Sequence, residues 1–68
     1  MHLEWHYRLK GADLYDMDKG VRVGCVHEGP NGDCIAMHLQ ENGAWKYLAD
    51  SIPFIKAKHV VEVVARLS

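Results

Sequence analysis

The sequence has few cysteines, few prolines and no long apolar run. Its two cysteines are too few for the disulfide framework of a small secreted domain. No stretch approaches the roughly 20 apolar residues that cross a bilayer, and the first residues do not have the pattern of a signal peptide. A net charge of −1 gives no overall attraction to nucleic acid or to a membrane. We therefore expect a cytoplasmic protein with no membrane partner.

The length of the chain predicts a single domain over residues 1–68. A domain of this size buries only about 60% of the surface that its unfolded chain exposes. Small domains commonly gain further stability from a metal, a disulfide or a partner surface. Self-association as a homodimer is therefore one expectation.

Two Asn-Gly pairs, Asn31-Gly32 and Asn42-Gly43, are the strongest structural signal in the sequence. Each lies between runs in which apolar and polar residues alternate, which is the pattern of a β-hairpin. Three-residue loops with glycine in the left-handed position pair Cys25 with Met37 and Met37 with Tyr47. A shift of one residue would mix the apolar and polar sets, so the hydrophobic pattern excludes it.

The remaining chain divides into strands, one acidic loop and a C-terminal segment. Residues 3–10 alternate cleanly and predict a first strand. Residues 11–20 are acidic and rich in turn formers, which indicates a loop in which Leu14 and Tyr15 either form a short extra strand or pin the loop to the core. The later strands are expected over residues 21–27, 34–40 and 44–48.

The C-terminal segment, residues 50–68, has apolar residues at helical spacing. Asp50 or Ser51 is the expected cap, and Pro53 is tolerated in the first turn. Its four valines leave an alternative, a short turn followed by a strand that closes a small SH3-like barrel. Strict alternation fails there, which favours the helix. The predicted fold is α+β: an antiparallel meander of three to four strands with one C-terminal helix on one face.

No cluster of residues predicts a metal site, a cofactor or catalysis. Cys25 and His27 lie on one side of the predicted sheet, and Cys34 and His38 lie on the other, so the four cannot converge on zinc. Cys34 and His38 are also about 13 Å apart along their strand, which is too far for a nucleophile and its base. The acidic loop lacks the ligand spacing of a calcium-binding loop. We expect a protein that is not an enzyme.

One helix can cover only one face of the sheet, and we expect it to cover the face with Cys25, Met37 and Tyr47. The opposite face has a small or apolar centre, which is typical of a contact surface. No aromatic side chain is expected on it, which argues against stacking with single-stranded nucleic acid. The candidate binding surface consists of His6, Arg8, Arg22, Gly24, Val26, Ala36, His38 and Lys46.

The order of elements resembles that of short phage and prophage proteins of βββα type. The resemblance rests on a first strand with Trp5, two turn-linked strands, the run Trp45-Lys46-Tyr47 and a C-terminal helix with Ala57-Lys58 and Val61-Glu62. Some of these proteins inhibit host defence systems, including anti-CRISPR proteins, and others are accessory or DNA-binding modules. The resemblance implies a compact protein that works by binding.

The expected function is therefore that of a small protein-interaction module. Such a module, from a phage or another mobile element, would bind a host protein and inhibit or tether it. A protein partner or a second copy of the chain is the favoured partner. The alternative is a DNA-binding accessory domain that uses Arg8, Arg22 and Lys46 on the open sheet face.

Overall fold

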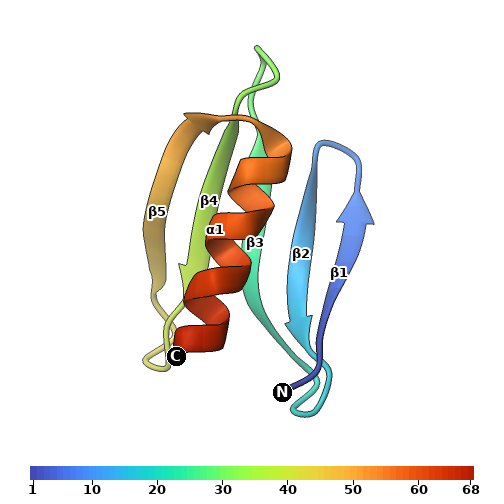
Figure 1. Cartoon of the computed structure of the whole chain (residues 1–68), viewed down its shortest axis with the longest axis vertical. Helices are drawn as coiled ribbons and strands as arrows, with labels where there is room; N and C mark the ends of the chain where they lie inside the picture. Colours follow the sequence, from blue (N-terminus) through green and yellow to red (C-terminus); the bar gives the residue numbers. More distant parts are fainter.

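The computed structural model describes all residues, 1–68, as a five-stranded antiparallel sheet with one helix packed on it (Figure 1). The strands follow one another across the sheet in chain order, so β1 and β5 form its edges. The predicted α+β class is confirmed, with five strands in place of three or four. The elements are β1 (Leu3–Arg8), β2 (Gly11–Asp16), β3 (Val21–Glu28), β4 (Cys34–Leu39), β5 (Trp45–Ile52) and α1 (Phe54–Leu67).

The two Asn-Gly turns have the predicted geometry. Gly32 and Gly43 have φ values of 84° and 88°, in the left-handed region that glycine adopts without steric cost. The Gly29 N–H donates to the Asp33 carbonyl at 2.8 Å, which closes the first loop. The corresponding bond closes the second loop, so both turns are the expected three-residue loops.

The register of the last three strands is also confirmed. Cys25 lies opposite Met37, and Met37 lies opposite Tyr47. Leu39 lies opposite Trp45, two residues further along the same pair of strands. Because side chains alternate between the faces of a sheet, these five residues share one face.

Most of the predicted acidic loop is in fact the strand β2, which pairs with both β1 and β3. Ala12 and Leu14 are fully buried, whereas Asp13 and Tyr15 point to the other face. A bulge shifts the pairing with β3 between Leu14 and Tyr15. The prediction of a loop is wrong for residues 11–16, because Asp13 alternates with the buried Ala12 and Leu14 as in a strand, although acidic residues are also common in turns.

The C-terminal segment is the predicted helix and not the final strand of a barrel. Its predicted cap is wrong. Pro53 occupies the cap position with an extended backbone, and no side chain caps the helix. Ser51 lies in β5 with a φ of 56°. The fixed φ of proline suits the start of a helix, where its missing N–H leaves no bond unmade.

The helix covers the face of the sheet opposite to the expected one. It packs on β3, β4 and β5, over the small residues Gly24 and Ala36, and it buries Ala57, Val61 and Ala65. A β-carbon at Gly24 would lie 2.3 Å from Val61 Cγ1, so the helix approaches the sheet closely only because this residue is glycine. Small side chains on both surfaces allow this close packing.

The core lies between the helix and this face of the sheet. It extends beyond the strands under the helix, because β2 contributes two fully buried side chains. The helix itself stands over β3 and β4, with β1 and β2 beside it (Figure 1). The core cluster consists of Leu14, Val26, Cys34, Ala36, Ala57, Val61 and Ala65, with half-buried residues packed around it.

Candidate interaction surface

The side of the sheet opposite α1 has no helix on it, and we call it the helix-free face. Strand pairing and the alternation of side chains define its members. Its side chains come from all five strands. They are Glu4, His6, Arg8, Asp13, Tyr15, Arg22, Cys25, His27, Ile35, Met37, Leu39, Trp45 and Tyr47.

A central row of side chains runs straight across the helix-free face. His6 lies opposite Asp13, Asp13 opposite Cys25, Cys25 opposite Met37, and Met37 opposite Tyr47. The row thus contains one residue from each strand, in strand order. Every other residue of the face lies on one side of this row or the other.

The β4–β5 half of the helix-free face is apolar. Ile35, Met37 and Leu39 are half-buried against their neighbours. Trp45 is 37% exposed and Tyr47 is 55% exposed. Large aromatic side chains in a solvent-exposed apolar patch are typical of a surface that contacts another molecule.

Arg22 joins the apolar half to the polar half. Its guanidinium carbon lies 4.9 Å from the centre of the Trp45 ring, which is a cation–π contact. Its Nη1 is 3.5 Å from Asp13 Oδ1, and Arg8 Nε donates to Asp13 Oδ2 at 3.2 Å. The Asp13 carboxylate is therefore held between two arginines, and much of the charge in the centre of the face is paired within the chain.

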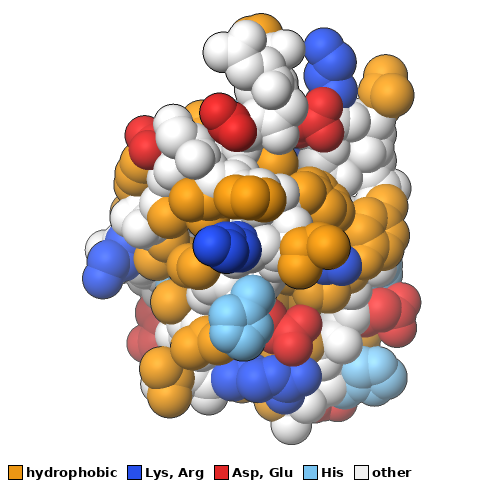
Figure 2. Space-filling view, turned by 45° about the horizontal axis from the view of Figure 1, so that its top comes forward, with side chains coloured by type: hydrophobic (Ala, Val, Ile, Leu, Met, Phe, Trp, Pro, Cys, Tyr) orange, Lys and Arg blue, Asp and Glu red, His pale blue; other side chains and the backbone are white.

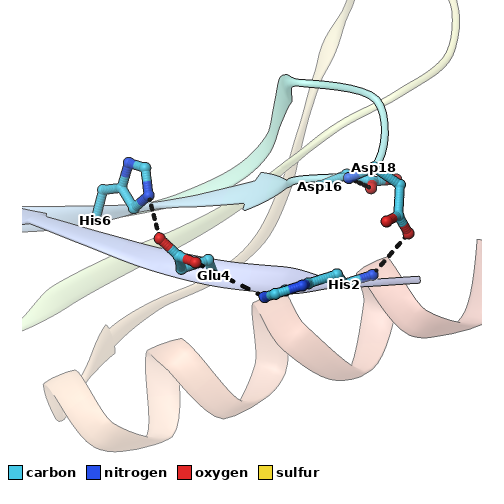
Figure 3. A network of polar contacts seen from close by, with 5 residues as sticks. All are labelled: His2, Glu4, His6, Asp16 and Asp18. Atoms are coloured by element: carbon cyan, nitrogen blue, oxygen red, sulfur yellow. Dashed lines mark hydrogen bonds and ion pairs between the residues drawn. The ribbon is translucent and has the colours of Figure 1, made fainter.

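The β1 edge of the face carries a chain of polar contacts (Figure 3). Glu4 lies between His2 and His6, with carboxylate oxygens 3.7 Å and 3.0 Å from their Nε2 atoms. The His6 ring stacks on Tyr15 at 4.5 Å between centroids. The His2 N–H donates to Asp18. No group of three or more His, Cys, Asp or Glu side chains is arranged to hold a metal ion.

The structure divides the predicted binding surface between the two faces of the sheet. His6, Arg8 and Arg22 lie on the helix-free face. The other five residues lie on the helix side, where four of them are buried and the fifth, exposed, is at the rim. Those five are Gly24, Val26, Ala36, His38 and Lys46.

The error has two physical causes. β2 inserts between β1 and β3, so the polar side chains of β1 align with Asp13 and Cys25 and not with Gly24. The bulge in the β2–β3 pairing then leaves Val23 unpaired and places Arg22 opposite Tyr15, on the helix-free face. The prediction that the face with Gly24 is open is therefore wrong.

Sequence reasoning assigned Met37, Trp45 and Tyr47 to the core and so missed them as surface residues. One signal in the sequence distinguishes the faces. The face with these residues carries large side chains, whereas the other carries Gly24 and Ala36, and a helix approaches small residues more closely.

The two cysteines lie on opposite faces, as predicted, and neither forms a disulfide. Cys25 belongs to the helix-free face but is only 5% exposed. Burial raises the pKa of its thiol, and the neighbouring Asp13 raises it further. Burial also raises the pKa of Cys34. Both thiols are therefore protonated at neutral pH and are poor nucleophiles.

A groove of about 640 Å³ lies at the end of the sheet near the C-terminus. His38, which is 8% exposed, lines it. Ser68 Oγ lies 3.5 Å from His38 Nε2. Burial lowers the pKa of His38, and Lys46 lowers it further, so the imidazole is neutral at pH 7. Acidic and basic side chains both line the groove, so its charge does not select a ligand.

The helix is tied to the edge strand β1 by polar and aromatic contacts. Figure 2 views the helix side from the end where α1 begins, and it shows hydrophobic side chains grouped around basic ones. Lys58 Nζ lies within 4.6 to 5.8 Å of the ring centres of Trp5, Tyr7 and Phe54, and it donates to the Tyr7 hydroxyl. Trp5 Nε1 donates to Glu62 at 2.9 Å. Lys58 of the same chain therefore already occupies the cation position against these aromatic rings.

The single helix is too short to span a membrane. Ala57, Val61 and Ala65 of this helix pack on the sheet, whereas Ile55 and Leu67 are exposed. No protein-family model matches the chain, and neither a curated protein nor a solved structure shows significant similarity to it.

Proposed function

We propose that this protein is a small, non-catalytic binding module that docks a protein partner on its helix-free face. The observation that carries the proposal is the apolar patch in which the exposed Trp45 and Tyr47 adjoin the half-buried Met37, with Arg22 stacked on Trp45. Trp, Tyr and Arg are the residues most enriched at the energetic centres of protein interfaces. A stacked arginine is also already ordered, which lowers the entropic cost of binding.

The charge distribution supports a protein partner. Protein interfaces combine apolar and polar areas, and the helix-free face sets its apolar β4–β5 half beside Glu4, Asp13, Arg8 and Arg22, two charges of each sign. Nucleic acid binding requires unpaired basic residues that displace counterions from phosphates. Both arginines are instead paired with Asp13.

The resemblance to phage and prophage proteins supports a more specific role, in which the module binds a host protein and inhibits or tethers it. The two free, buried cysteines support a reducing compartment such as the cytoplasm. This role needs no chemistry from the module itself. Occlusion of a partner's surface is sufficient.

One observation favours a second candidate, binding of single-stranded nucleic acid. The expectation that no aromatic side chain lies on the open face is wrong, because Trp45 and Tyr47 lie there exposed. Aromatic side chains on an open sheet stack on bases in several single-strand binders. This candidate predicts binding to an oligonucleotide that weakens steeply with salt.

The test is capture of partners from a lysate by the tagged protein, with and without nuclease. Met37→Arg should remove a nuclease-resistant protein partner, because it places a charge in the centre of the apolar half. The control is Ile55→Arg, since Ile55 is 80% exposed on the helix. Retention of the partner by Met37→Arg, with circular dichroism showing an intact fold, would contradict the proposal. Loss of all capture after nuclease would favour the second candidate.

A further inference from the structure

We propose that a second copy of this chain occupies the helix-free face, in a face-to-face dimer whose two-fold axis runs along the central row. This inference rests on the proposed function, because it names the protein partner of the same surface. In such an isologous dimer each residue contacts the residue that the rotation places opposite it. The arrangement of side chains can therefore be tested for self-complementarity.

Apolar side chains meet apolar side chains under this rotation. A two-fold axis along the central row keeps each strand over its own counterpart and exchanges the two ends of every strand. Met37, on the axis, faces Met37 of the second copy, and Leu39 faces Ile35. The apolar β4–β5 halves thus cover each other, with the two sheets about 10 Å apart as in stacked sheets.

Charges are complementary under the same rotation. Glu4 and Arg8 lie on β1, two residues to either side of His6 in the central row. The rotation therefore places Glu4 of each copy opposite Arg8 of the other. Asp13 lies on the axis, where two carboxylates meet, but each is neutralised by Arg8 and Arg22 of its own chain. An axis parallel to the strands, through the centre of the sheet, would instead set the apolar half against the polar half.

The size of the face fits a dimer of a small protein. The Cα atoms extend over 34 × 20 × 18 Å, and the sheet lies in the plane of the two longer dimensions (Figure 1). A second copy laid over this face would cover an area of the same order as the roughly 800 Å² per partner of standard interfaces. The cover would bury Trp45 and Tyr47, the exposed aromatic residues of the face.

Analytical ultracentrifugation over a concentration series tests the dimer. We expect the wild-type chain to dimerise at micromolar concentrations. Met37→Glu should raise the dimer Kd by about 100-fold or more, because it sets two carboxylates against each other on the axis. Ile55→Glu should leave the Kd unchanged. A dimer that persists in Met37→Glu would show that the chain uses another surface, such as the β5 edge, and would overturn the proposal.

A pair of charge reversals tests the direction of the axis. Glu4→Arg alone and Arg8→Glu alone should each be mostly monomeric. In either homodimer, positions 4 and 8 carry charges of the same sign and face each other at two places. An equimolar mixture of the two variants should dimerise, because both pairs between positions 4 and 8 are then of opposite sign. Circular dichroism checks that each variant is folded. A mixture that stays monomeric while the wild type dimerises would overturn this axis.

The outcome also separates this inference from the proposed function. If the wild type is monomeric at every concentration but Met37→Arg loses a captured protein, the second copy is excluded and the protein-binding face stands. If the wild type is monomeric and an oligonucleotide binds in a salt-dependent manner, both proposals fail.

Discussion

Gly24 in β3 lies directly against Val61 in α1. A β-carbon at position 24 would be 2.3 Å from Val61 Cγ1 and 3.3 Å from the Met37 carbonyl oxygen. This contact sets the distance between helix and sheet, because neither side can move closer without overlap. It is also the reason that the helix packs over small residues and leaves the face with Trp45 and Tyr47 without a cover.

Gly24→Ala should destabilise the fold by about 1–3 kcal/mol, the usual cost of adding a methyl group to a filled core. Urea unfolding followed by circular dichroism gives the free energy of unfolding. Val61→Ala removes the atom that the new methyl would strike. The double variant should therefore be more stable than the sum of the two single effects predicts. Simple additivity of the two changes would contradict the contact.

The free energy of unfolding should decrease as the pH is lowered, and His38 should be responsible for part of this decrease. Burial lowers the pKa of His38 below its ordinary value of 6.5, so the unfolded chain takes up this proton at a higher pH than the folded protein does. The free energy of unfolding should therefore decrease as the pH falls through 6.5 toward the lowered pKa.

Urea unfolding at a series of pH values measures this dependence. In His38→Leu, the free energy of unfolding should vary less with pH from pH 7 down to the more acidic range in which carboxylates begin to titrate. His59→Gln changes an exposed histidine on the helix and should keep the slope. An unchanged slope in His38→Leu would show that another group is responsible.

Lys58 should contribute to stability through the aromatic rings around it. Lys58→Met keeps the length of the side chain but removes the cation, and we expect a loss of about 1 kcal/mol. Lys56→Met, at an exposed position of the same helix, is the matched control and should change little. Thermal unfolding compares the two. Equal melting temperatures would mean that the cluster of Lys58 with Trp5, Tyr7 and Phe54 adds no stability.

The second hairpin should depend on glycine at position 43, where φ is 88°. Gly43→Ala should destabilise the fold by about 1 kcal/mol, because a β-carbon is strained in the left-handed region. Gly43→Asn should cost less, since asparagine adopts this region more readily. Chemical unfolding ranks the three proteins, and an alanine variant as stable as the wild type would contradict the turn geometry.

The hairpins could be predicted because their information is local. Asn-Gly specifies the turn, and the turn together with the alternating pattern specifies which residues pair. Cys25 opposite Met37 and Leu39 opposite Trp45 follow from these signals alone. The helix was predictable for a similar reason, since adjacent valines separated by Glu62 fit a helical stripe and not an alternating strand.

The covered face could not be predicted from the same signals. Both faces of β3 and β4 carry apolar residues, so the pattern does not say which one meets the helix. The choice depends on a close approach at Gly24 and on the placement of β2, neither of which is a local property. The predicted site combined residues of two faces. The unexpected strand β2 and the bulge in its pairing with β3 change which residues of β1 and β3 share a face of the sheet.

The most direct measurement is hydroxyl-radical footprinting of the protein, free and in its complex with a captured partner or a second copy. Met37, Trp45 and Tyr47 report on the helix-free face, and the exposed Tyr7 reports on the β1 and helix side. We expect binding to protect Met37, Trp45 and Tyr47 and to leave Tyr7 as reactive as before. Protection of Tyr7 with Trp45 and Tyr47 unchanged would contradict this expectation.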